Sequence, residues 1–450
     1  MKEKKERLRP ADYVLGVQHL FAMFGATVLV PLLTGLNPAL ALVSAGIGTL
    51  IFHVCTKFKV PVFLGSSFAF IAPIATIVAT QGVNAAQGGI IFAGLLYLLF
   101  ALIAFLIGPD RIKRIFPPVV TGPVIIVIGV GLAYAAINDA FGLFREFSVS
   151  DGGAVSSILT FDSLSILISV FVVIVVVCVS VFMRGFFKLI PILFGIVAGY
   201  LLCVVLHLLG IYTMNFEAVA NAPWVNIPYV TEGFFSLPSF NITAILTIAP
   251  VAIVTFMEHI GDITTNGMVV GQNFFKDPGL HRTLIGDGIA TSFAGFIGGP
   301  ANTTYSENTG VLATTKNYNP KILRIAAVFA IILGFFGKFG AVLQTIPNPV
   351  KGGVEIILFG MIAAIGIRTM SEADLDFTNS RNLIIVALIL IVGLGVNIAT
   401  YDALNFTTSG IPVQIGDVSM SMSGLFLAVV VGIVANLILP LKADDTADEK

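Results

Sequence analysis

The sequence predicts an all-α polytopic membrane protein, and three observations support this prediction. Of the 450 residues, 57% are apolar and 11% are charged, against roughly 25% charged residues in an ordinary soluble domain. The mean hydropathy of +0.99 leaves too few polar residues to coat a soluble core of this length. Long unbroken apolar runs, such as 165–182, favour helices over a barrel, whose strands alternate over about ten residues. The composition therefore excludes soluble enzymes, nucleic-acid-binding proteins, secreted disulfide scaffolds and disordered chains.

Fourteen apolar segments are candidates to cross a membrane, which takes about 20 residues per helix. The third, ninth and tenth of them are short or interrupted. In chain order, the segments are 13–33, 38–56, 61–79, 88–108, 117–136, 161–183, 189–210, 242–264, 283–299, 302–316, 322–344, 349–368, 382–398 and 422–441.

The basic residues predict the orientation of these segments. If the N-terminus lies inside, 21 of the 24 Lys and Arg residues fall in inside loops, only Arg145 and Lys351 fall outside, and Lys338 falls within a segment. Cytoplasmic loops carry such an excess of basic residues. One segment more or fewer would scramble the pattern beyond it, so we expect both termini to be cytoplasmic. The long loops 137–160, 211–241 and 397–421 are then extracellular or periplasmic.

Short motifs do not indicate catalysis or a cofactor. The three cysteines, Cys55, Cys178 and Cys203, lie in or at the ends of apolar runs, and their spacing fits neither a metal site nor a disulfide framework. The sequence lacks a phosphate-binding GxxxxGK[ST], a GxSxG and an HExxH motif. We therefore expect no enzyme activity, no metal and no cofactor. Coupling to an ion gradient is the simplest energy source.

An internal repeat predicts the architecture. PVVTGPVIIVIG, from Pro118 to Gly129, aligns without gaps on PVKGGVEIILFG, from Pro349 to Gly360, at an offset of 231 residues. These are the fifth and twelfth segments, seven apart, so the two copies must cross the membrane in opposite directions. Inverted repeats of this kind are common in secondary transporters, whose substrate site lies near the bilayer midplane between discontinuous helices. We therefore expect a seven-plus-seven inverted repeat.

The third and tenth segments are also seven apart, and both are interrupted. PVFLGSSFAFIAP (61–73) and GGPANTTYSENTG (298–310) carry Gly, Pro and small hydroxyl residues where a lipid-facing helix would carry Leu. Extended backbone at this depth is tolerated only where it is buried in protein or lines a cavity. We expect short extended stretches here, followed by half-helices whose N-terminal amides can bind a polar ligand.

Acidic residues within apolar segments are costly and mark candidate functional positions. Glu258 and Asp262 are four residues apart and share one helix face. Glu307 lies in the tenth segment and Asp287 in the ninth, while Glu355 lies in the twelfth, near a pocket or an interface. Two carboxylates that face a third cannot all ionise cheaply in a low dielectric, so at least one is expected to carry a proton near neutral pH. A structural role, such as capping a half-helix, is the alternative for each.

Three other side chains in these segments are open to two interpretations. His259 points to a different helix face from Glu258, which favours a structural role. His19 follows Gln18 early in the first segment, which suggests packing or hydrogen bonding near the site. Phe68 in the third segment could stack on a flat ligand or pack in the core.

Several motifs together resemble the nucleobase–ascorbate transporter family, also called the nucleobase:cation symporter-2 family. The similarity covers nearly the whole chain and is closest to bacterial uracil permeases. ENTGVLATTK (307–316) fits the family signature of an acidic or amide residue, N-x-G-x4-T and a basic residue. The other motifs are QHLFAMFGATVLVP (18–31), GSSFAFIAP (65–73), EHIG (258–261), DPGLHR (277–282) and NTTYSENTGV (302–311).

The resemblance implies proton symport of a nucleobase by a fold with core and gate domains, often dimeric, in which the core moves like an elevator. It implies that the base meets two glutamates, Glu258 and Glu307, a stacking ring at Phe68, and backbone amides near Ser67 and Ser306. The substrate-binding residues are thus Phe68, Ser67, Glu258, Tyr305, Ser306 and Glu307. The candidates for proton coupling are Asp262, Glu258, Glu307 and Asp287.

The sequence departs from the closest uracil permeases at several of these positions. Asp262 stands where those permeases carry a histidine implicated in proton coupling. Purine-transporting relatives have aspartates matching Asp262 and Asp287, but they usually show Gln in place of Glu307. Ser306 replaces a glycine, and Phe359 replaces a tyrosine. Uracil is the first choice of substrate, because Glu307 can accept a ring N–H while backbone amides meet a pyrimidine carbonyl. Xanthine or urate is the second.

We therefore expect a proton-coupled nucleobase importer of the cytoplasmic membrane, with the lipid bilayer, protons and a second copy of the chain as partners and with no nucleic acid. An anion transporter or channel of the same architecture is the rival, but a carboxylate at Glu307 would repel an anion. The expected organisation is a cytoplasmic N-terminus (1–12), a first repeat (13–210), an extracellular loop (211–241), a second repeat (242–441) and an acidic cytoplasmic tail (442–450).

Overall fold

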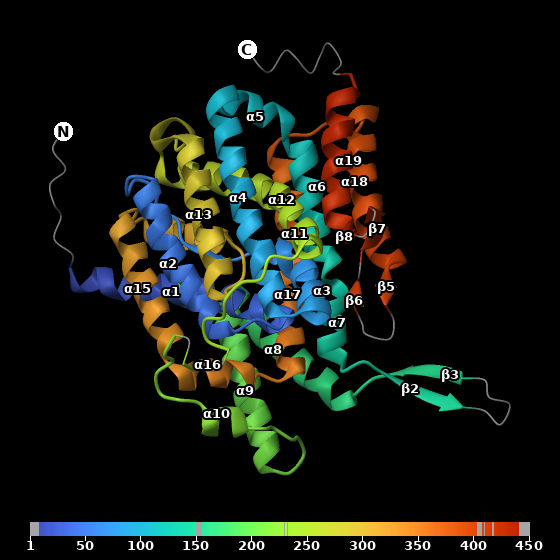
Figure 1. The fold of residues 1–450 in the computed structure, drawn as a ribbon. Helices are drawn as coiled ribbons and strands as arrows, with labels where there is room; N and C mark the ends of the chain where they lie inside the picture. The colour runs from blue at the N-terminus through green and yellow to red at the C-terminus, as the bar shows by residue number, and fades with distance from the viewer. Residues whose placement is uncertain are drawn as a thin grey trace.

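The computed structural model describes residues 9–149, 155–228, 230–231, 233–402, 407–408, 410–415 and 418–440, and it shows a bundle of long helices (Figure 1). The expected tail and residues 1–8 lie outside this range. Within it, nine helical segments are long and apolar enough to cross a membrane. They are α1 (Pro10–Thr34), α2 (Pro38–Cys55), α4 (Val83–Ile107), α6–α7 (Pro118–Gly131 and Ala133–Phe141), α8 (Ser163–Phe182), α9 (Pro191–Leu208), α11–α12 (Ile242–Ile248 and Ala252–Val270), α17 (Asn348–Glu372) and α18 (Ser380–Ala399).

Shorter helices occupy the rest of the expected segments. They are α3 (Ile71–Gln81), α13 (Leu280–Ile297), α14 (Ser306–Thr315), α15 (Pro320–Phe335), α16 (Gly337–Gln344) and α19 (Gly424–Ile438). Each of the fourteen expected segments thus coincides with a helix, a pair of consecutive helices, or a strand followed by a helix. The helical, polytopic architecture is confirmed, while the count of fourteen crossings stays a prediction. Two short helices, α5 (Pro109–Ile115) and α10 (Glu217–Asn221), lie between these segments and were not expected.

Several of the helices begin at a polar cap that the sequence supplies. The side chains of Asn37 and Asn319 accept a hydrogen bond from a backbone amide in the first turn of α2 and α15, and a proline follows each of them. Asn and Asp are favoured at this position because their oxygens satisfy amides that the helix leaves free, and Pro fits the first helical turn. Asp162 caps α8 in the same way, and it also accepts a hydrogen bond from the Ser165 hydroxyl.

Two of the long expected loops contain β-hairpins. β2 (Phe144–Val149) pairs antiparallel with β3 (Val155–Thr160), and β7 (Ile411–Ile415) pairs with β8 (Val418–Met422). A further two-residue pair, β5 (Tyr401–Asp402) with β6 (Thr407–Thr408), lies before the second hairpin. Among these strands, β8 (VSMSM) alternates apolar and polar residues, a pattern typical of strands with one exposed face. In Figure 1 the β2–β3 hairpin projects from the lower end of the bundle.

The helices pack in two groups, and the packing repeats itself. The first group contains α1–α4 and α11–α16, and the second contains α6–α9 and α17–α19. Three contacts between helices recur with other helices in the same roles. The contact of α2 with α15 corresponds to that of α13 with α4, and the contact of α8 with α9 corresponds to that of α18 with α19. The contact of α17 with α8 corresponds to that of α6 with α18. In each of these correspondences, a helix and its counterpart are seven expected segments apart; α2 and α13, for example, are the second and the ninth. This reciprocity is what a repeat of seven segments requires.

The repeated motif itself forms an antiparallel helix pair, α6 with α17. A side chain at Gly129 would collide with the backbone at Phe359, and a side chain at Gly122 would collide with Met370. Residue numbers therefore rise along α6 as they fall along α17. The small residues let the two backbones approach closely, as is common between membrane helices.

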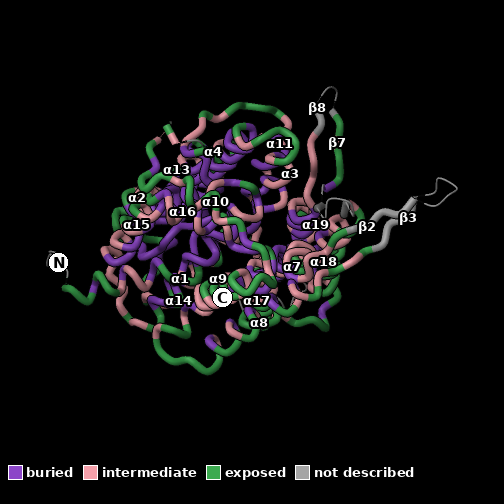
Figure 2. Tube along the Cα trace, turned by 90° about the horizontal axis from the view of Figure 1, so that it is seen from below, coloured by how far each residue is buried: buried purple, intermediate pink, exposed green. Residues whose placement is uncertain are grey.

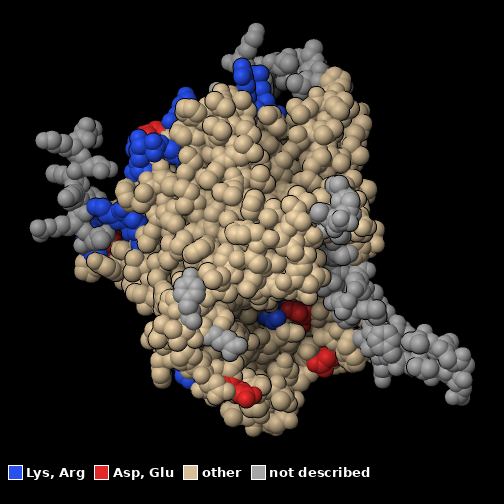
Figure 3. Space-filling model, in the orientation of Figure 1, with Lys and Arg blue, Asp and Glu red and all other residues tan. Residues whose placement is uncertain are grey.

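Buried segments and charged side chains are distributed unevenly over the bundle. Seen from below in Figure 2, buried segments gather between α1, α2, α4 and α13, and exposed segments lie around them. In Figure 3 the visible Lys and Arg side chains gather mainly toward the upper end of the bundle, near α5 and the start of α13, while acidic side chains show at the lower end. On this face, the end that carries α5 is therefore the more basic one, and we refer to it as the basic end.

Candidate functional site

The two interrupted segments meet in a two-stranded antiparallel sheet inside the first helix group. β1 (Leu64–Ser66) pairs with β4 (Asn302–Thr304), with Gly65 opposite Thr303. All six strand residues are buried. The expected extended stretches are thus confirmed in both segments. Because each strand satisfies the backbone groups of the other, irregular backbone is tolerated at this depth.

A helix begins directly after each strand. A short 3₁₀ turn (Phe68–Phe70) leads into α3 after β1, and α14 starts at Ser306, two residues after β4. Helix N-termini present free amides and a partial positive charge, so both ends can bind a carbonyl or carboxylate oxygen. The Ser67 side chain is fully buried, and its hydroxyl oxygen has no hydrogen-bond partner among the described residues.

An aromatic pair joins the two helix groups beside these N-termini. The ring of Phe68 meets the ring of Phe359, on α17, edge to face at a centroid distance of 6.0 Å. Both rings are largely buried. Phe68 belongs to the first group and Phe359 to the second, so a flat ligand that stacks on Phe68 would lie next to the boundary between the groups.

The carboxylates of α12 face the start of α14. Asp262 accepts hydrogen bonds from the hydroxyls of Thr304 (2.7 Å) and Ser306 (2.5 Å). Glu258 lies one turn earlier and is half-buried, and its Oε2 atom has no partner among the described residues. Ser306 and Glu307 are exposed although their neighbours are buried. The structure therefore brings Glu258, Asp262, Ser306 and Glu307 together.

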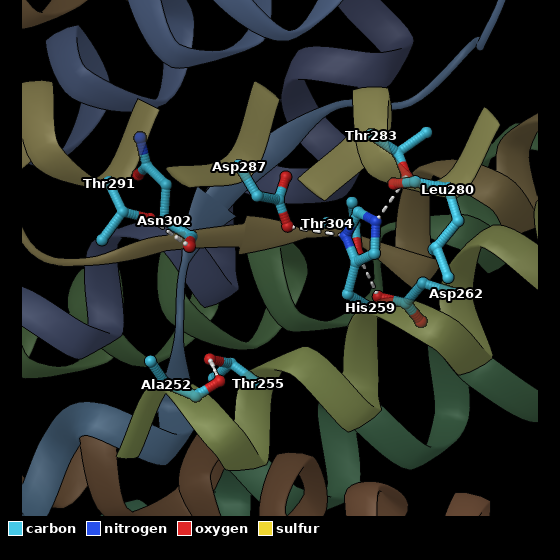
Figure 4. A network of polar contacts seen from close by, with 10 residues as sticks. All are labelled: Ala252, Thr255, His259, Asp262, Leu280, Thr283, Asp287, Thr291, Asn302 and Thr304. Carbon is cyan, nitrogen blue, oxygen red and sulfur yellow. Dashed lines mark hydrogen bonds and ion pairs between the residues drawn. The ribbon is translucent and has the colours of Figure 1, made fainter. Parts of the chain in front are cut away.

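Asp287 belongs to a different network, which Figure 4 shows. His259 bonds through Nδ1 to Asp287 Oδ2 (2.7 Å) and through Nε2 to Thr283 Oγ1 (2.8 Å), and all three side chains are fully buried. These contacts tie α12 to α13 on the side of α12 away from Glu258. His259 is thus buried and hydrogen-bonded, as its helix face predicted, and Asp287 hydrogen-bonds to His259 while its charge is also close enough to act on Glu258.

The Tyr305 side chain points away from the exposed cluster. Its hydroxyl donates to the carbonyl of Ser66 (2.8 Å), and its ring packs against Gly65. Only 4% of the residue is exposed, so this side chain supports the strand pair. Any direct contact with a ligand would have to come from the Tyr305 backbone.

Other residues at the site had no individual signal in the sequence. Asn308 donates through Nδ2 to the His19 carbonyl (3.0 Å) and lies 3.2 Å from His19 Nδ1, which fixes α14 against α1. Thr304 holds Asp262 from β4. Asn308 is the asparagine of the N-x-G signature, so the family motif could have identified it. Thr304 is one of many threonines, and only the fold reveals its partner.

The arrangement suits a small planar ligand with both donors and acceptors. Carboxylates accept N–H groups, helix amides and hydroxyls donate to carbonyls, and an aromatic ring covers a flat face. No group of three or more His, Cys, Asp or Glu side chains among the described residues could hold a metal ion. Glu355 lies apart from this cluster, on α17 near Lys351.

Comparison with known proteins identifies the family. A family model described as the permease family matches residues 11–402. The chain belongs to this family, the nucleobase–ascorbate transporters. It is therefore a multi-pass membrane transporter and not an enzyme.

Curated relatives match almost end to end. A probable uracil permease of Pasteurella multocida is 45% identical over 436 residues, covering 97% of this chain and 95% of the relative. The uracil permease of Bacillus subtilis is 42% identical, covering 96% and 93%. That of Escherichia coli is 40% identical, covering 95% and 91%.

Solved structures share the fold at low sequence identity. The transmembrane domain of a cyanobacterial bicarbonate transporter is 16% identical with a TM-score of 0.59, covering 95% of this chain and 97% of that one. A murine solute carrier 26 anion transporter in the inward-facing state is 9% identical with a TM-score of 0.66, covering 97% and 69%. At such identities the likeness concerns the fold alone.

Proposed function

We propose that this permease imports a nucleobase, uracil first, together with protons. The observation that carries the proposal is the cluster of Glu258 and Glu307 beside the N-terminus of α14 and the ring of Phe68. Its relatives named uracil permeases, at 40–45% identity over most of the chain, support the same substrate. Uracil is planar and carries two ring N–H donors and two carbonyl acceptors, which match this set of groups.

The binding mode follows from the hydrogen-bonding chemistry of each group. Glu258 and Glu307 accept the ring N–H groups, and the amides near Ser67 and Ser306 donate to the carbonyls. The ring of Phe68 covers one face of the base. A base held by two carboxylates and two helix ends would exclude analogues that lack either N–H, because a buried acceptor would then be left unpaired.

Proton coupling rests on the density of carboxylates at the site. Glu258, Asp262 and Glu307 approach one another within the membrane-spanning bundle, where like charges repel strongly. A proton taken up with the base removes part of this repulsion. We place the coupling on Asp262, Glu258 and Glu307, and we assign Asp287 an indirect role through His259.

The membrane arrangement is part of the proposal. The basic end of the molecule faces the cytoplasm, as the enrichment of basic residues in inside loops suggests. The chain crosses the cytoplasmic membrane fourteen times with both termini inside, as repeats 13–210 and 242–441 joined by the extracellular loop 211–241. The first helix group acts as the core and moves against the second, the gate, in an elevator-like cycle. The permease forms a homodimer.

Uptake by reconstituted proteoliposomes tests the function. We expect an inward proton gradient to drive accumulation of radiolabelled uracil, and a protonophore to abolish it. Accumulation that persists without the gradient would refute proton coupling. Glu307→Gln should lose at least tenfold in uracil affinity, because it replaces a charged acceptor by a neutral amide that keeps only one acceptor oxygen and adds an NH2 donor. Glu372→Gln, at a side chain that is 66% exposed on α17, is the matched control and should bind uracil normally.

Assays on the same proteoliposomes distinguish the proposed function from two alternatives. Xanthine and urate are the second substrate choice, since Asp262 and Asp287 match the purine-transporting pattern. Competition by xanthine but not by uracil would favour them. The fold neighbours include anion transporters, but the exposed Glu307 at the N-terminus of α14 would repel an anion. Bicarbonate or chloride transport without uracil transport would support an anion transporter instead.

A further inference from the structure

Asp262 is connected to the exposed part of the site through a single hydroxyl. Ser306 lies at the first position of α14 and is exposed, and its Oγ donates to Asp262 Oδ1. Thr304 bonds to the other carboxylate oxygen, but it is buried in β4 with 2% of its surface exposed. Asp262 itself is half-buried behind these two hydroxyls. Of the two hydroxyls, only that of Ser306 is exposed, so only this one is placed to contact Asp262 and a ligand at the same time.

We propose that Ser306 is a hydroxyl switch that converts protonation of Asp262 into affinity for the ligand carbonyl. The inference rests on the proposed function and specifies which side chain links the proton to the base.

The switch has two states, which differ in the protonation of Asp262 and in the group to which the Ser306 hydroxyl donates. When Asp262 is ionised, it can only accept, so the Ser306 proton is committed to it. Ser306 then offers lone pairs to the ligand, and these repel a carbonyl oxygen. When one proton from solvent binds Asp262, the acid can donate to Ser306 Oγ. The Ser306 hydroxyl proton is then free to turn to the ligand carbonyl. No other bond forms or breaks.

Binding of the base and of the proton are therefore mutually favourable, as reciprocal linkage requires. The hydrogen bond gained at Ser306 is a neutral one, so protonation should tighten binding by about three- to tenfold. A base that carries a carbonyl at that position gains affinity as the pH falls, and an analogue without the carbonyl does not.

Other titratable groups face Asp262 and respond to the same change in pH. Glu258 and His259 lie on its own helix and Glu307 on α14. Tyr97, on α4, faces Glu258 and Asp287 rather than Asp262. Asp287, on α13, acts through His259. The described residues of α6 and α19, which also pack on α12, contribute no Asp, Glu, Lys, Arg or His. A comparison of variants that leave all these groups in place is therefore needed.

Ser306→Ala and Thr304→Val form such a matched pair, because each removes one hydroxyl from Asp262. The experiment measures the Kd of the purified full-length protein for radiolabelled uracil from mildly acidic to mildly alkaline pH. We expect Ser306→Ala to lose the three- to tenfold gain at acidic pH. Thr304→Val should keep a gain of wild-type size, with only its midpoint moved. Ser306→Thr, which restores a hydroxyl, should restore the gain.

The possible outcomes separate the inference from the proposed function. If the wild type binds uracil more tightly at acidic pH and Ser306→Ala retains that gain in full, the switch is refuted. If both variants lose the gain equally, Ser306 merely shares a structural role with Thr304, which also refutes it. If the wild-type protein does not bind uracil at any pH, the proposed function itself fails.

Discussion

Lys351 and Asp139 form an ion pair between α17 and α7, with 3.3 Å between Nζ and Oδ2 and about an eighth of each side chain exposed (13% and 12%). Glu355 lies one turn after Lys351 on α17, fully buried, and neither of its carboxylate oxygens accepts a hydrogen bond from a described residue. Lys351 was one of only two basic residues that the sequence placed on the side of the membrane away from the cytoplasm. Its position beside two carboxylates explains why a cation is retained there.

Removal of the cation should destabilise the protein more than removal of the whole pair. Lys351→Met leaves Asp139 buried without its partner, which typically costs about 3–5 kcal/mol. We expect a clear fall in the thermal midpoint of the detergent-solubilised protein. The double variant Lys351→Met/Asp139→Asn should recover part of that fall, because it removes both charges. Additive losses in the double variant would show that the pair is not coupled.

At the residue scale, the sequence identified side chains whose type is rare in its surroundings. Glu258, Asp262 and Glu307 stood out because carboxylates are scarce in apolar segments, and the structure places them together. Thr304 and Asn308 did not stand out, since their significance depends on partners more than 40 residues away or on another helix. The bond between His259 and Asp287 likewise joins helices that sequence spacing does not relate.

The elements at the centre of the fold depend on one close contact between the two interrupted segments. Gly65 of β1 packs against the ring of Tyr305, and a Cβ there would also lie 2.8 Å from Thr27 Oγ1 on α1. The ring, the strand pair and α1 therefore fit only around a glycine. The sequence predicted that both segments are interrupted, because Gly, Pro and hydroxyl residues are unfavourable in a lipid-facing helix.

Gly65→Ala tests this contact. Overpacking of a buried site costs about 1–3 kcal/mol, so we expect a lower thermal midpoint and weaker uracil binding, because β1 leads directly into Ser67 and Phe68. Gly395→Ala is the matched control, since a Cβ on this α18 residue meets no atom within 4 Å. It should equal or slightly exceed the wild type in stability. Equal behaviour of the two variants would remove the structural role assigned to Gly65.

The hairpins and the short helices are elements that the sequence did not predict. The β2–β3 hairpin and α10 lie in loops that mix polar residues with scattered apolar and aromatic ones, and neither element carries a repeat or a recognisable motif. The choice between loop and strand there depends on pairing with another stretch of chain. The apolar segments were located more reliably, because length and hydropathy alone determine which stretches a bilayer accepts.

At the scale of the whole molecule, the inverted repeat links sequence and packing. A twelve-residue match at an offset of 231 predicted segments related in opposite orientations, and helices seven segments apart indeed make equivalent contacts. The division into two groups could not be predicted from the repeat, because each group draws helices from both halves of the chain. Contacts within each group are extensive, and fewer elements touch across the boundary.

The boundary between the groups offers a direct test of their relative motion. A Cβ on Gly25, in α1 of the first group, would lie 3.1 Å from Ile192 Cβ, in α9 of the second. A Cβ on Gly16 would lie 3.0 Å from Ile325 Cβ, and both residues belong to the first group. These separations are equal within a tenth of an ångström and slightly below those of natural disulfides, which are about 3.5–4.5 Å. The two sites therefore differ mainly in whether the bond would join the two groups.

We expect the cysteine pair Gly25→Cys/Ile192→Cys, made after Cys55, Cys178 and Cys203 are replaced by serine, to lose uracil uptake on oxidation and to regain it on reduction. Binding of uracil should survive, because neither residue contacts the proposed site. The pair Gly16→Cys/Ile325→Cys should cross-link without loss of uptake, since α1 and α15 move together. Transport that continues at full rate with α1 bonded to α9 would show that the groups do not slide past each other, and an elevator-like cycle would then be wrong for this permease.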